Sequence, residues 1–91
     1  MASELKPKIL FFSHDRCRYC PLAEKLLQDL GLEYEKMDVA RSSEACKMAE
    51  KYGILMVPSI VISYNGSHKV FSGYTENLRQ KIQQFLNEVV S

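Results

Sequence analysis

Two segments of this chain are apolar on both of their faces, and this feature limits the available folds more than any other. Residues 8–13, KILFFS, carry two large apolar side chains on each face of a strand, and residues 56–64, MVPSIVISY, are also apolar on both faces. A strand buried on both faces lies inside a sheet that other elements cover from each side. The sequence therefore predicts two central strands between layers of helix.

Weaker patterns predict the remaining strands. Residues 32–39, LEYEKMDV, begin with an apolar–polar alternation that suits an edge strand. Asn65-Gly66 separates two strand-like runs, and Asn-Gly at that place is a strong signal for a hairpin with a type I′ turn. Gly73 is expected to end the fourth strand.

Three helices are expected between and after these strands. One runs from about residue 17 to 30, with Leu22, Leu26 and Leu30 in one buried row beside Ala23 and Leu27. Another is capped by Ser42 and ends near residue 52, and the last begins near Thr75 as N-cap. The apolar stripe of the last helix consists of Leu78, Ile82, Phe85, Leu86 and Val89.

The predicted order is β-α-β-α-β-β-α, an α/β fold with a four-stranded sheet ordered 2-1-3-4 and helices on both faces. The 91 residues suffice for a single domain over residues 1–91, with a flexible N-terminus at residues 1–7. A net charge of +1 favours neither nucleic acid nor a membrane surface as a partner. No apolar run is long enough for a leader peptide or a membrane span, so we expect a cytoplasmic monomer.

The stretch HDRCRYCPLA, residues 14–23, carries the most chemistry. It places Cys17 where the first strand gives way to a helix, and the positive end of a helix favours an anionic thiolate. Arg16, Arg18 and His14 are candidates for tuning that thiolate. Cys20 follows about one helical turn later, within reach of a disulfide with Cys17. In such a pair Cys17 attacks a substrate disulfide and Cys20 resolves the mixed disulfide.

Two other interpretations of the pair stay open at this point. Cys17 and Cys20 would be two ligands of a zinc site completed by Cys46 or His14, or would hold an iron–sulfur cluster shared between two chains. The third interpretation is a redox-inert interaction domain. For Cys46 alone, the helical pattern predicts an inert, partly buried thiol.

Pro58 does not suit the predicted central strand, because a proline has no N–H to donate to a neighbouring strand. Misfits of this kind often mark functional sites.

Over roughly residues 8–90 these features together resemble the glutaredoxin and thioredoxin-like superfamily. The resemblance is carried by Cys17-Arg18-Tyr19-Cys20 between strand and helix, by Val57-Pro58-Ser59 at the third strand, and by Gly73 after the fourth. Tyr19 is typical of glutaredoxins. Arg18 stands where they commonly have proline, His14 where they often have lysine, and Met56 where they favour threonine.

The resemblance implies a thioredoxin-like fold and a cis peptide bond between Val57 and Pro58. It implies that the Val57 backbone pairs with a bound disulfide-bearing chain. Tyr19, because it lies between the two cysteines, is expected to line the substrate groove. The resemblance further places substrate against the segment Gly73, Tyr74 and Thr75.

The implied activity is that of a dithiol–disulfide oxidoreductase in electron transport and cell redox homeostasis, with no bound cofactor and no metal. Its substrates would be protein disulfides or glutathione mixed disulfides. Glutathione or a thioredoxin-type reductase would supply the electrons.

Overall fold

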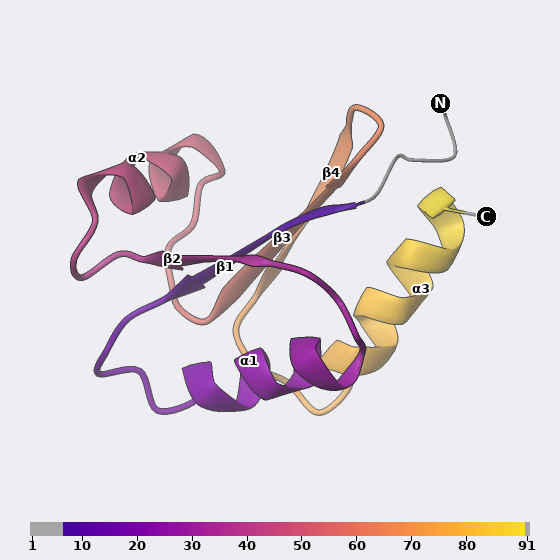
Figure 1. Ribbon diagram of the computed structural model, residues 1–91, viewed down its shortest axis with the longest axis horizontal. Helices are drawn as coiled ribbons and strands as arrows, with labels where there is room; N and C mark the ends of the chain where they lie inside the picture. The colour runs from indigo at the N-terminus through magenta and orange to yellow at the C-terminus, as the bar shows by residue number, and fades with distance from the viewer. Residues whose placement is uncertain (1–6, 91) are drawn as a thin grey trace.

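The computed structural model describes residues 7–90, so the predicted flexible segment at residues 1–7 lies outside the described residues except for Pro7. The elements follow the predicted order (Figure 1): β1 (Lys8–Ser13), α1 (Cys20–Asp29), β2 (Glu35–Asp38), α2 (Ser43–Lys51), β3 (Ser59–Tyr64), β4 (Ser67–Ser72) and α3 (Leu78–Val90). The four strands form one sheet in the order β2-β1-β3-β4. β1 is parallel to β2 and antiparallel to β3, and β4 is antiparallel to β3. The predicted mixed α/β sheet is confirmed.

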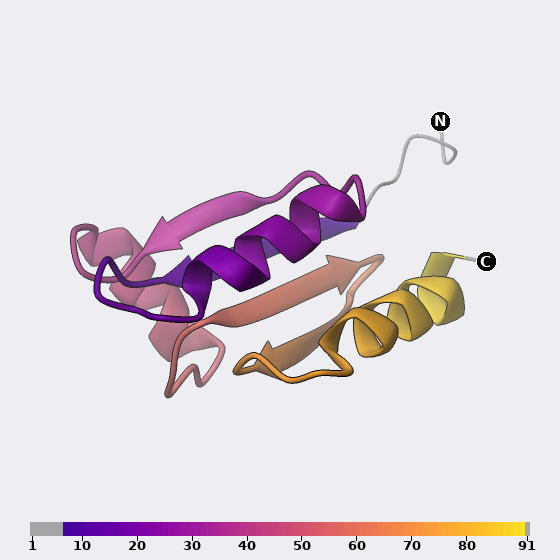
Figure 2. The same cartoon turned by 90° about the horizontal axis from the view of Figure 1, so that it is seen from below.

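Helices cover both faces of the sheet, because β1 and β3 carry apolar side chains on both sides. α1 and α3 lie on one face, where they pack against Ile9, Phe11, Ile60 and Ile62 (Figure 2). α2 lies on the other face, where its Ala45 meets the second set of sheet residues, Leu10, Phe12, Met37 and Val61. The doubly apolar strands therefore produce a core on each side of the sheet.

Local signals fixed two of the connections as predicted. Asn65 and Gly66 both have positive φ, 51° and 87°, as a type I′ hairpin turn requires. Ser42 is the N-cap of α2, and its hydroxyl accepts a hydrogen bond from the Ala45 N–H at 3.1 Å.

The start of α1 was predicted three residues too early. Tyr19 is the N-cap and Cys20 the first helical residue, so Cys17 lies in the loop before the helix. Pro21 explains the boundary, since a proline fits only the first turn of a helix. The buried residues of α1 are Cys20, Ala23 and Leu27, whereas Leu22, which was expected in the buried row, is exposed.

The other boundaries differ in the same direction. β2 begins at Glu35 rather than at residue 32, and β3 begins at Ser59 rather than at residue 56. Pro58 therefore precedes the strand and interrupts no ladder bond inside it. α3 begins at Leu78, and the Thr75 hydroxyl donates to the Asn77 side chain instead of capping the helix.

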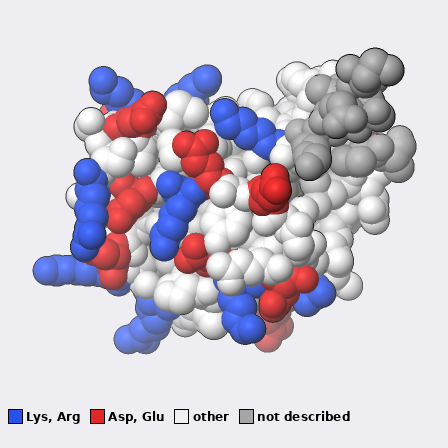
Figure 3. Space-filling model, viewed as in Figure 1, with Lys and Arg blue, Asp and Glu red and all other residues white. Residues whose placement is uncertain are grey.

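Three loops meet at one end of the sheet: the loop after β1, the segment before β3 and the segment after β4 (Figure 2). The two ends of the described chain lie at the opposite end of the sheet. Basic and acidic side chains are interspersed over the face in Figure 3. Among the described residues, no helix has the length and apolar character needed to cross a bilayer.

Candidate active site

Cys17 and Cys20 form a disulfide at this end of the sheet, with their Cα atoms 5.4 Å apart. That separation lies within the usual range for a disulfide. The two cysteines differ in exposure, since Cys20 is only 5% exposed in the core while Cys17 is partly buried at its edge. Cys17 is therefore the more accessible cysteine of the pair.

The start of α1 presents unsatisfied positive charge beside the disulfide. Tyr19 makes no side-chain capping bond, and the first turn of α1 holds no acidic residue. Arg16 and Arg18 are exposed, and neither forms an ion pair with a described acidic residue. Although Cys17 precedes the helix, the free N–H groups and both guanidinium groups favour an anion at this place.

Cys17 is also held by His14. Its backbone N–H donates to the His14 carbonyl oxygen at 3.0 Å, which closes a turn between β1 and the disulfide. The His14 ring contacts Arg16 and Asp15 rather than a sulfur atom.

The Val57–Pro58 peptide bond is cis, as the resemblance implied. Among residues 7–90, no hydrogen bond is made by the backbone N–H or C=O of Val57. Its neighbours are fixed instead: the Pro58 carbonyl accepts from the Gly73 N–H at 2.8 Å, and the buried Ser59 hydroxyl donates to the Met56 carbonyl at 2.6 Å. The N–H and C=O of Val57 are thus available for hydrogen bonding, in a segment that the bonds of Pro58 and Ser59 hold in place.

The segment after β4 comes back toward the cysteine loop. Gly73 has a φ of +80°, a conformation that favours glycine. Its N–H hydrogen bond to the Pro58 carbonyl oxygen holds the backbone in place just before Tyr74. The rings of Tyr74 and Tyr19 stack with centroids 6.1 Å apart and planes 7° from parallel. Both tyrosines are exposed, so the pair forms an aromatic surface beside the disulfide. Thr75 is exposed next to this pair.

Two apolar residues near this site were not singled out from the sequence as site residues. Leu55 is 96% exposed and Met56 is 54% exposed, immediately before Val57. The predicted strand over residues 56–64 concealed Met56, because a residue inside a central strand is expected to be buried. Leu55 precedes that strand, and no sequence pattern marked it.

A polar network beside Cys20 was also missed. Tyr34 donates its hydroxyl to Glu24 at 2.7 Å, and the Lys36 ammonium group donates to the other oxygen of Glu24 at 3.2 Å. The hydrogen bond from Tyr34 is the main cause that lowers the pKa of Glu24; burial opposes it, and Lys36 lowers it further. Glu24 and Lys36 line a cavity of about 270 Å³ together with Cys20 and His14. The sequence carried no signal for contacts between residues ten and twelve positions apart.

Cys46 is exposed rather than partly buried, and its thiol donates to the Val39 carbonyl oxygen at 3.1 Å. It faces outward because the buried position of α2 is Ala45, one residue earlier. Among residues 7–90, no three side chains of histidine, cysteine, aspartate or glutamate gather to hold a metal ion. The zinc interpretation therefore has no ligand set in the described structure.

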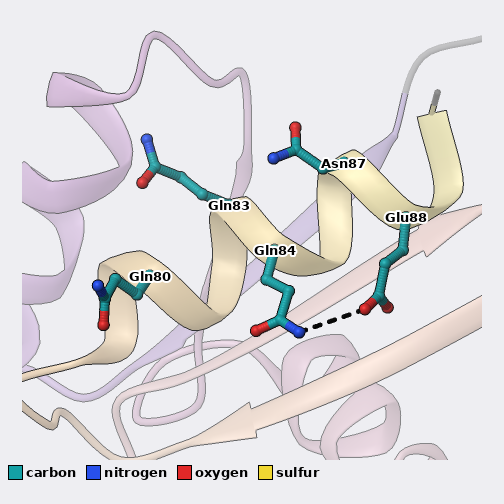
Figure 4. A pocket seen from close by; sticks show the side chains of 5 residues that line it. All are labelled: Gln80, Gln83, Gln84, Asn87 and Glu88. Atoms are coloured by element: carbon teal, nitrogen blue, oxygen red, sulfur yellow. Dashed lines mark hydrogen bonds between the residues drawn. The ribbon is translucent and has the colours of Figure 1, made fainter.

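An open cavity of about 640 Å³ lies along α3, away from the disulfide. Its lining is rich in side-chain amides, and Figure 4 shows Gln84 donating to Glu88 at 3.4 Å. The other lining residues are Gln80, Gln83 and Asn87. None of these side chains is a thiol nucleophile, so the chemistry of this chain centres on the other end of the sheet.

Comparison with solved structures identifies the fold. Thioredoxin O2 from Arabidopsis thaliana matches with a TM-score of 0.75 and 16% identity, over 99% of this chain and 79% of that one. A mutant thioredoxin from Halobacterium salinarum matches with a TM-score of 0.77 and 19% identity, over 99% and 80%. A mutant of the thioredoxin-like protein BC3987 matches with a TM-score of 0.69 and 26% identity, over 87% and 99%.

No curated protein sequence matches this chain. The family model described as Glutaredoxin matches residues 9–69, which include the cysteine pair and the Val57–Pro58 bond. The fold and the redox-type disulfide support thiol–disulfide oxidoreductase activity in general. With about two thirds of its length matched, the chain belongs to the glutaredoxin family within the thioredoxin-like superfamily.

Proposed function

We propose that this chain reduces disulfides by dithiol exchange, with Cys17 as the attacking thiol and Cys20 as the resolving thiol. The difference in exposure within the pair carries this assignment, since Cys20 is 5% exposed and Cys17 lies at the edge of the core. Only the outer sulfur is accessible to a sulfur atom of a large substrate. The uncapped start of α1 and the two unpaired arginines favour Cys17 as the thiolate.

The exchange has two steps. The Cys17 thiolate attacks one sulfur of the substrate disulfide, so that a mixed disulfide forms and the other substrate sulfur leaves as a thiolate. Cys20 then loses its proton and attacks the Cys17 sulfur, which closes the Cys17–Cys20 disulfide and releases the second substrate thiolate. Two electrons have passed from the dithiol to the substrate.

The free backbone groups of Val57 support a substrate that lies alongside as an added strand. Two main-chain hydrogen bonds would hold the peptide next to its disulfide, as in other cases of strand addition. The stacked rings of Tyr19 and Tyr74 would cover the opposite side of that peptide, next to Thr75, and Gly73 would hold Tyr74 in place.

The substrates proposed are protein disulfides and glutathione mixed disulfides. The Cys17–Cys20 disulfide is reduced again by two molecules of glutathione or by a thioredoxin-type reductase, and the chain needs no bound cofactor. A cytoplasmic location and action as a monomer belong to the same proposal.

Single-cysteine variants test this mechanism. With a disulfide-bearing protein and a reductant, Cys17→Ser should abolish exchange. Cys20→Ser, reduced and then mixed with that protein after the reductant is removed, should accumulate a mixed disulfide visible as an added mass on the intact chain. Cys46→Ser, the matched control, should retain full activity. Exchange by Cys17→Ser at the rate of the unaltered chain would refute the assignment.

A coupled assay tests the reductant. Disulfide substrate is supplied with glutathione and glutathione reductase in one arm and with thioredoxin reductase in the other, and NADPH consumption is followed. The arm that sustains turnover identifies the electron donor, and failure of both arms would contradict the proposal.

A further inference from the structure

One nitrogen of the His14 ring lies against a donor and an acceptor at the same time. Nδ1 is 3.0 Å from the backbone nitrogen of Arg16 and 3.1 Å from Oδ1 of Asp15. A ring nitrogen without a proton accepts a hydrogen bond, and one with a proton donates. The two contacts therefore cannot both be hydrogen bonds in one protonation state: Arg16 requires a bare Nδ1, and Asp15 requires a protonated one.

The contact with Arg16 closes a turn that has a close counterpart in the neighbouring loop. Ala40 donates its N–H to Oδ1 of Asp38 at 2.9 Å, with the same spacing of two residues. Ser13 and Asp38 are paired at the ends of the parallel strands β1 and β2, so the two turns leave the sheet next to each other. In the counterpart the acceptor is a carboxylate, the usual acceptor in turns of this kind.

At His14 the acceptor is instead an imidazole nitrogen, and histidine is the side chain whose charge changes most readily near neutral pH. Several charged side chains near the His14 ring affect the balance between its neutral and protonated forms. Arg41 contacts Oδ2 of Asp15 at 3.6 Å and Oδ2 of Asp38 at 3.9 Å. Glu24 and Lys36, which line the same cavity, are already bonded to each other. Arg16 and Arg18 complete the list of charged side chains in this loop.

We propose that His14 is a pH-sensitive positioning residue for the turn that carries Cys17. When His14 is neutral, Nδ1 accepts the Arg16 N–H and the turn is closed. When His14 is protonated, Nδ1 donates to Asp15 and the Arg16 N–H is released. Since the Cys17 N–H is bonded to the His14 carbonyl oxygen, the attacking sulfur is attached to the residue that switches. This inference rests on the proposed role of Cys17.

Amide hydrogen exchange and ¹H–¹⁵N NMR of the full chain in its disulfide form test the switch. Between pH 8 and pH 5.5 the Arg16 amide signal should move in one step with the ring signals of His14. Its exchange, corrected for intrinsic pH dependence, should increase roughly fivefold, the loss expected for one ordinary hydrogen bond.

Three variants make the test specific. In His14→Asn a side-chain oxygen replaces Nδ1 as acceptor at the same spacing, so the turn should stay closed and the step should vanish. In His68→Asn, which removes the other histidine of the chain, the step should be unchanged. In Asp15→Asn the protonated ring loses the negative charge of its acceptor, so the step should move to lower pH.

The proposal would be overturned if the Arg16 amide signal did not change together with the His14 ring signals as the pH is lowered. It would also be overturned if the step persisted in His14→Asn. The failure of the oxidoreductase mechanism would appear separately, as exchange activity in Cys17→Ser, because these measurements need neither substrate nor reductant.

Discussion

Replacing Tyr34 by phenylalanine removes one hydroxyl that ties α1 to the segment before β2. That hydroxyl donates to Glu24 at 2.7 Å and accepts from the Gln28 side chain at 3.1 Å. The ring itself packs edge-on against Phe11 with centroids 5.9 Å apart, and a phenylalanine keeps this contact. The substitution therefore isolates the hydrogen bonds.

The expected loss in the free energy of unfolding at pH 7 is about 1.5 kcal/mol. Hydrogen bonds to charged groups contribute roughly 1.5–3 kcal/mol, and we take the lower end because the Glu24 side chain is 25% exposed to solvent. For a domain of this size the corresponding decrease in Tm is about 8 °C.

The loss should depend on pH in a defined direction. The pKa of Glu24 is lowered in the folded chain, first by the Tyr34 hydrogen bond. A lowered folded-state pKa stabilises the native state above the unfolded value and ceases to do so as pH falls through the folded value. The pKa of Tyr34 is raised, first by burial, so its neutral hydroxyl is available throughout this range. The difference in the free energy of unfolding between Tyr34→Phe and the unaltered chain should be largest at pH 7 and should decrease toward about pH 3.

Urea unfolding at pH 7 and near pH 3 measures both quantities. Tyr64→Phe is the matched control, since the Tyr64 hydroxyl forms no hydrogen bond with a described residue. The control should change the free energy of unfolding by less than about 0.5 kcal/mol. A Tyr34→Phe loss that is equally small, or one that is as large in acid as at neutral pH, would refute the reasoning.

Three further substitutions test other parts of the account. Gly73→Ala should cost about 1–2 kcal/mol in urea unfolding because of the positive φ; the added Cβ would lie an ordinary 3.6 Å from the Met56 sulfur, so a larger loss would point to steric conflict instead. Ser42→Ala should cost about 1 kcal/mol by loss of the α2 cap, and no change in the unfolding midpoint would contradict that role. Tyr74→Ala should lower kcat/KM for a disulfide-bearing peptide about twofold to thirteenfold, from a stacking contribution of about 0.5–1.5 kcal/mol, and an unchanged value would remove Tyr74 from the binding surface.

Local sequence patterns predicted the fold well because each of its elements depends on short-range chemistry. The doubly apolar strands determined the central positions of β1 and β3, the Asn65-Gly66 pair determined the hairpin, and Ser42 determined the start of α2. Boundaries were predicted less well. Pro21 restricts α1 to a start at Cys20, whereas the leucine pattern begins only at Leu22 and therefore does not show where the helix starts.

The candidate site was predicted in part. The cysteine pair follows from spacing, and its disulfide is confirmed. The cis bond at Pro58 was implied only by the resemblance, since most bonds before proline are trans. The stack of Tyr19 on Tyr74 and the network around Glu24 join residues that are distant in sequence. Such contacts follow from the packing of the sheet and helices, and single-residue patterns do not encode them.

The central claim is that the Cys17 sulfur is the reactive thiolate of this chain, and site-resolved alkylation tests it most directly. The fully reduced chain is treated with a small excess of iodoacetamide at neutral pH, and the modified peptides are identified by mass spectrometry. Cys46 serves as an internal reference, because it is exposed and lies outside the pair. Cys17 should react at least about tenfold faster than Cys46 and before Cys20. Equal rates at Cys17 and Cys46, or earlier modification of Cys20, would contradict the account.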